Sequence, residues 1–126
     1  MRPKSLAEVA ARTAEGDSFD RCLANFLDAF YASPAAGALE EVPRRLYASG
    51  NEVGRIQDAY LAATAEELAR TFNLPSPEWA RAEGRQLHRP WFASPLASLR
   101  AVLLQESPPA FRCRNLFVSG NALSRA

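Results

Sequence analysis

One histidine, His88, and two cysteines, Cys22 and Cys113, are the side chains best suited to act as nucleophiles, bases or zinc ligands. Zinc takes about four nitrogen or sulfur ligands, or three with a water, and these residues lack any such spacing. Nucleophilic catalysis needs a base within reach of a hydroxyl or thiol. His88 precedes Arg89 and Pro90, which is more typical of a surface turn. The sequence predicts neither a metal site nor an enzyme.

The sequence also lacks the patterns of a phosphate-binding loop and of a carboxylate metal site. The six glycines are scattered, whereas a phosphate-binding loop needs them at fixed steps. Residues 119–121 are typical of a turn. The neighbouring Glu66 and Glu67 have no second acidic pair and fit a solvated helix face. We therefore expect no cofactor and no catalytic residues.

Composition is typical of a globular domain. The 126 residues are 48% hydrophobic and 23% charged, enough to bury a core without disulfides or metals. The N-terminus is polar and lacks the apolar stretch of a signal peptide. No apolar run approaches the length of a membrane span. We expect a cytoplasmic protein with both thiols free.

Two helices are predicted in the first third. Residues 4–15 follow a capping box of Ser5 and Glu8, but their apolar face is weak, so we expect fraying over residues 1–16. After Gly16, Asp17 is the predicted cap of a helix over 17–32. Its apolar face follows helical spacing and marks a main core helix: Phe19, Cys22, Leu23, Phe26, Leu27 and Phe30.

A longer helix is predicted from a capping box at Ser49 and Glu52 to about Phe72, with a favourable pair between Glu66 and Arg70. Its expected buried face is Val53, Ile56, Tyr60, Ala63, Leu68 and Phe72. Short helices are expected near 34–39 and 76–83, and a short element containing Phe111 after Ser107 and Pro108.

A second strong core helix is predicted after Ser94 and Pro95, anchoring the last third to the helix over 17–32. Its apolar side is Leu96, Leu99, Val102 and Leu103. The chain is thus expected to be all-α, a compact bundle of five to seven helices. It forms one domain over residues 1–126, with an irregular, proline-rich C-terminal third.

The segment 88–126 holds the candidate contact residues. Residues 83–126 carry six arginines against two glutamates, a net charge of +4. Trp, Tyr and Arg dominate contact hot spots. On that basis the predicted partner-binding residues are Trp91, Phe92, Arg112, Arg114, Asn115 and Phe117. Alternatively, Trp91 and Phe92 close one end of the core, because most aromatic side chains are buried for packing.

Nucleic-acid binding is an alternative. Arg112, Arg114 and Arg125 alternate with Phe111 and Phe117 and would give a basic, partly aromatic surface strip. Against this, Pro108 and Pro109 interrupt any helix-turn-helix, and a domain that depends on phosphate contacts usually carries more positive charge.

Four motifs follow one another in order: DAYLAA at 58–63, LPSPEW at 74–79, RPWF at 89–92 and SPPAFRCRNLFV at 107–118. This series resembles a family of small bacterial proteins without an established activity. It also resembles segments that follow helix-turn-helix domains in antitoxins encoded beside nucleotidyltransferase-like toxins. The resemblance covers residues 53–126 and implies no particular functional residues.

What the resemblance implies is a cytoplasmic partner, and neutraliser, of a nucleotidyltransferase-like protein. Residues 1–50 show no clear DNA-binding motif, so operator binding is not expected. The leading hypothesis is a non-catalytic protein-interaction module. A helical nucleic-acid binder and a structural subunit of a larger assembly are the alternatives.

Overall fold

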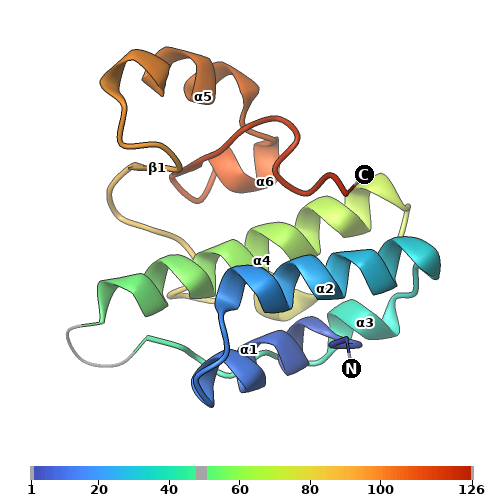
Figure 1. The fold of residues 1–126 in the computed structure, drawn as a ribbon. Helices are drawn as coiled ribbons and strands as arrows, with labels where there is room; N and C mark the ends of the chain where they lie inside the picture. The colour runs from blue at the N-terminus through green and yellow to red at the C-terminus, as the bar shows by residue number, and fades with distance from the viewer. Residues whose placement is uncertain (1, 48–50, 126) are drawn as a thin grey trace.

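The first four α-helices build the body of the fold in the computed structural model, which describes residues 2–47 and 51–125 (Figure 1). They are α1 (Leu6–Ala14), α2 (Phe19–Ala32), α3 (Gly37–Glu40) and α4 (Glu52–Thr71). Two more, α5 (Arg100–Glu106) and α6 (Pro109–Arg112), follow in the last third. The predicted mostly helical fold is confirmed for the described residues. It also contains two strands of two residues each.

Helix α1 is capped and packed against the core, and the fraying expected over residues 1–16 stays a prediction. Ser5 caps α1, its hydroxyl accepting a hydrogen bond of 3.1 Å from the Glu8 N–H. Leu6 and Val9 are fully buried because they join the core formed by α2 and α4. Gly16 ends the turn with a φ of +114°, a conformation that glycine adopts without strain.

Helix α2 supplies the aromatic side of the core, as its spacing predicts. Its cap is Ser18 rather than Asp17, because the Ser18 hydroxyl accepts from the Arg21 N–H at 3.3 Å. Ring centroids of Phe26 and Phe30 lie 5.7 Å apart, and Phe30 meets Phe72 edge to face at 5.3 Å. Such offset and T-shaped contacts are the favourable aromatic geometries.

Helix α4 runs through the middle of the molecule and differs from prediction in detail. The predicted cap, Ser49, lies outside the described residues; the Asn51 side chain accepts from the Gly54 N–H. Val53, expected in the core, is 61% exposed, because the first turn of α4 extends beyond α2 (Figure 1). Its alanines pack the other helices instead: Ala59, Ala62, Ala63, Ala65 and Ala69 are buried.

The segment after α4 packs back against α4 through a short 3₁₀ helix. Asn73, with a φ of +55°, ends α4. A 3₁₀ helix, η1 (Glu78–Arg81), then places Trp79 in the core, where its indole N–H donates to the Leu39 carbonyl at 2.9 Å. Strand β1 (Trp91–Phe92) pairs in parallel with β2 (Leu116–Phe117).

The predicted second core helix is not a core helix. Residues 94–106, containing η2 (Ala97–Leu99) and α5, lie away from α2 at the top of Figure 1. Helix α5 makes its main contacts with η2 and β2. Only Leu103 within this segment is buried. The predicted anchoring to α2 is therefore wrong. We call residues 94–106 the arm.

Candidate protein-interaction surface

Four of the predicted partner-binding residues meet at the base of the arm. The Trp91 N–H donates to the Asn115 carbonyl at 2.8 Å, and the Asn115 side-chain amide donates to the Leu87 carbonyl at 2.8 Å. Phe92 stacks on Phe117 with centroids 5.2 Å apart. Trp91, Phe92 and Asn115 are partly exposed, whereas Phe117 is buried. Together they fix both ends of the loop that carries the arm.

Arg114 lies inside the protein rather than on a surface strip. Its guanidinium is 2.9 Å from the Glu66 carboxylate and donates to the carbonyls of Ala110 at 2.7 Å and Ala80 at 2.8 Å. It therefore links α4, η1 and α6. The predicted pair between Glu66 and Arg70 is wrong for the same reason, because Glu66 faces Arg114 and Arg70 pairs with Glu67.

The other C-terminal arginines are on the surface but engaged. Arg112 is exposed and donates to the Ser107 carbonyl at 2.8 Å, near the last turn of α5. Arg125 pairs with Asp28 at 2.9 Å. Since Phe111, Phe117 and Arg114 are buried, the basic, partly aromatic strip proposed from the sequence does not form. Burial of the aromatics in the core separates the residues that would have composed it.

The arm displays large apolar side chains to solvent instead. Leu96 is 59% exposed, Leu99 39%, Val102 43% and Leu104 46%. Sequence reasoning assigned three of these residues to the core and missed Leu104. A signal was available: Val102, Leu103 and Leu104 are consecutive, and three consecutive helical residues cannot all face one core.

The arm is held at both ends, which keeps this apolar surface in place. Next to its start, the Ala93 N–H donates to the Phe117 carbonyl at 3.0 Å, and midway along it the Arg100 guanidinium lies 5.2 Å from the centre of the Phe92 ring. At its end the buried Ser107 hydroxyl donates to the Leu103 carbonyl at 2.6 Å and accepts from the Val118 N–H at 2.8 Å. The exposed side chains are thus presented on a fixed helical scaffold.

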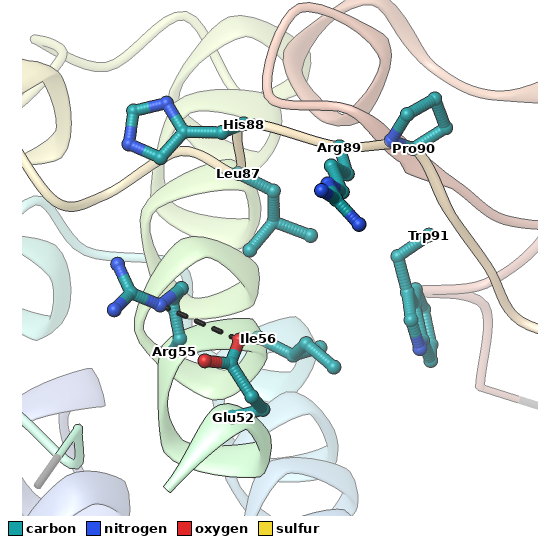
Figure 2. Close-up of a pocket in the computed structure, with 8 residues that line it drawn as sticks. All are labelled: Glu52, Arg55, Ile56, Leu87, His88, Arg89, Pro90 and Trp91. Carbon is teal, nitrogen blue, oxygen red and sulfur yellow. Dashed lines mark ion pairs between the residues drawn. The ribbon is translucent and has the colours of Figure 1, made fainter. Parts of the chain in front are cut away.

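A basic cleft of about 720 Å³ opens beside β1 (Figure 2). Ile56 and Leu87 lie between Arg55 and Trp91 in this view, and the His88 ring points away from them. Its lining residues are Glu52, Arg55, Ile56, Leu87, His88, Arg89, Pro90 and Trp91. Arg55 lies 3.5 Å from Glu52, which leaves Arg89 and His88 as further basic groups at the rim.

An apolar groove of about 740 Å³ lies on the other side of Trp91, between α2, α4 and the C-terminal residues. Ile56 and Trp91 line both hollows. The groove's larger apolar residues are Phe19, Leu23, Leu27, Val53, Ile56, Tyr60, Trp91 and Val118. Burial, helped by the nearby Asp20 carboxylate, raises the pKa of Tyr60 to about 12. Tyr60 therefore stays neutral near neutral pH, and the polar residues of the lining are Ser18, Asp20, Gln57, Ser119 and Arg125.

The part of the chain that the structure describes contains neither a metal-ligand cluster nor a helix that could span a membrane. Over residues 2–47 and 51–125, no cluster of three or more His, Cys, Asp or Glu side chains is arranged to hold a metal ion. Within those same ranges no helix combines the length and apolarity of a membrane span. Cys22 and Cys113 are both free thiols.

The fold and these surfaces define a small helical protein with an exposed apolar arm beside an apolar groove. No family model, curated protein or solved structure matches the chain.

Proposed function

We propose that this chain is a non-catalytic protein-interaction module that contacts its partner through the arm. The exposure of Leu96, Leu99, Val102 and Leu104 on one short segment carries the proposal. Several large apolar side chains exposed on one short segment are typical of a protein contact site. As the motif series implies, the partner is a nucleotidyltransferase-like toxin, which the chain binds and neutralises.

The free energy gained by covering these apolar side chains is large enough to support a protein contact. Burying apolar surface contributes roughly 25 cal/mol per Å², so covering each of these half-exposed side chains is worth about 1–2 kcal/mol. The four together are worth several kcal/mol in a complex, a sizeable part of a micromolar affinity of about 8 kcal/mol. Because the arm is already held at both ends, little ordering entropy opposes binding.

Nucleic-acid binding has less support. It requires free arginines near the C-terminus, yet Arg114 is buried against Glu66 and Arg125 pairs with Asp28. A phosphate would have to compete with those carboxylates. The remaining alternative, a subunit of a larger assembly, would use the same apolar arm and differs in the identity of the partner.

The test is co-purification of the chain with the nucleotidyltransferase-like protein encoded beside it. We expect Val102→Asp to lower affinity at least about thirtyfold, since it places a carboxylate in an apolar contact. Val42→Asp is the matched control, because Val42 is also exposed but lies outside the arm. Equal retention of the partner by both variants, or none by the wild type, would overturn the proposal.

A further inference from the structure

The arm and the apolar groove adjoin on the same molecule. Trp91 and Ala93 line the groove, and the arm begins at the next residue, Ser94. One is a projecting apolar helix and the other an apolar hollow. Both are apolar surfaces that the described residues of this chain leave at least partly open to solvent.

Two neighbouring complementary surfaces on one chain meet the condition for a closed symmetric pair. In a two-fold dimer, residue i of one protomer contacts residue j of the other, and the reverse contact follows by symmetry. A two-fold axis near Ala93 would set each arm over the other protomer's groove. Both apolar surfaces would then be covered in a closed pair.

Each of the two surfaces carries one basic and one acidic group, so a charge on one can face the opposite charge on the other. The arm carries the exposed Arg100 in its first helical turn and Glu106 in its last. The groove is lined by the exposed Asp20 and by Arg125, which pairs with Asp28; the adjoining cleft carries Arg89, and its Arg55 pairs with Glu52. Arg100 suits Asp20, and Glu106 suits Arg89. Such complementarity fixes orientation more than it adds affinity.

We infer that a second copy of this chain occupies the groove, each protomer seating its arm between α2, α4 and Trp91 of the other. This inference rests on the proposed function in one respect, that the arm is the contact surface. Since the same arm would then be buried in the dimer, self-association and binding of the other protein exclude one another. Self-association thereby sets the fraction of chains whose arm is available to the other protein.

Sedimentation velocity on the full chain alone tests this inference without the other protein. We expect a reversible shift from the 13.8 kDa monomer towards twice that mass as concentration rises through the micromolar range. Val102→Asp in the arm and Val53→Asp in the groove should each raise the dimer dissociation constant at least about tenfold. Val42 is the control, because it is the same residue type as Val53 at the same 61% exposure but lines neither the arm nor the groove. Val42→Asp should therefore leave the dimer dissociation constant unchanged.

Mixing the two variants tests the geometry. A pair of one Val102→Asp chain and one Val53→Asp chain keeps one intact arm and groove contact, so the mixture should associate more strongly than either variant alone. Association blocked by the arm variant but untouched by the groove variant would indicate contact between arms and overturn the assignment of the groove. A wild type that stays monomeric would overturn the inference while leaving the co-purification result unaffected. All three positions are exposed, so failure to fold is not expected to confuse the outcome.

Discussion

Asp58 holds the segment before α4 in place, and its replacement should destabilise the fold more than any surface change. The side chain is 1% exposed. Its two carboxylate oxygens accept hydrogen bonds from the N–H groups of Leu46 at 2.7 Å and Tyr47 at 3.1 Å. One of them also lies 3.8 Å from the buried Arg85 guanidinium, which in turn donates to the Pro43 carbonyl.

Asp58→Asn keeps the shape but removes the charge and one acceptor. The new amide NH₂ would face a backbone N–H, leaving a buried donor unsatisfied at a cost of about 1–3 kcal/mol. Arg85 would also lose its counter-charge, and breaking a buried ion pair costs about 3–5 kcal/mol. The two costs overlap, so we expect a total near 4 kcal/mol. With a urea m-value of about 2 kcal/mol/M, the midpoint falls by roughly 2 M.

Urea unfolding followed by circular dichroism measures this change, with Asp20→Asn at an exposed site as the control. Burial, and to a lesser degree Arg45, lowers the pKa of Arg85 to about 10, although Asp58 raises it. Desolvation of Arg85 therefore outweighs its attraction to Asp58. It follows that Asp58→Asn combined with Arg85→Met should lose less stability than Asp58→Asn alone. A single-variant loss below about 1 kcal/mol would refute this account of the pair.

Three further measurements follow. Gly54→Ala should lower the free energy of unfolding by several kcal/mol in urea, because the new Cβ would lie 2.6 Å from the carbonyl carbon of Leu46. Gly37→Ala is the control: its Cβ would meet nothing within 4 Å, so the change should be neutral or stabilising. Tyr60 has a folded pKa raised from 10 to about 12. Stability from its neutral form is therefore present below pH 10 and lost between pH 10 and 12, and Tyr60→Phe should flatten that fall of up to about 3 kcal/mol. A thiol reagent should label the exposed Cys113 in the native state and Cys22 only on unfolding, since burial covers Cys22 and raises its pKa; rapid labelling of both would contradict the fold.

Local signals predicted the helical body well. Ser5 with Glu8, the stop at Gly16 and the aromatic face of α2 depend on residues within one or two turns, and each is confirmed. A cap or an amphipathic face is fixed by neighbouring residues. The misplacement of the α2 cap by one residue is of the kind expected at helix ends.

Contacts between distant segments could not be predicted in this way. Arg114 and Glu66 are 48 residues apart, so nothing in either local pattern shows that they meet. Val53 follows the period of the buried face of α4 but is 61% exposed. Periodicity identifies an apolar face, and tertiary packing decides whether another element covers it. The same limit explains the arm, whose apolar residues suggested a core helix.

Five of the predicted partner-binding residues also hold the arm in the structure, and their part in binding a partner stays a prediction. Trp91, Phe92, Asn115 and Phe117 join the two ends of the loop from which the arm projects, and the buried Arg114 fastens its lower end to α4. Replacing Arg114 should weaken binding through loss of stability, visible in urea unfolding as well as in binding. Val102→Asp changes only exposed surface and should weaken binding with the unfolding midpoint unchanged. This difference separates the residues that hold the arm from those proposed to make the contact.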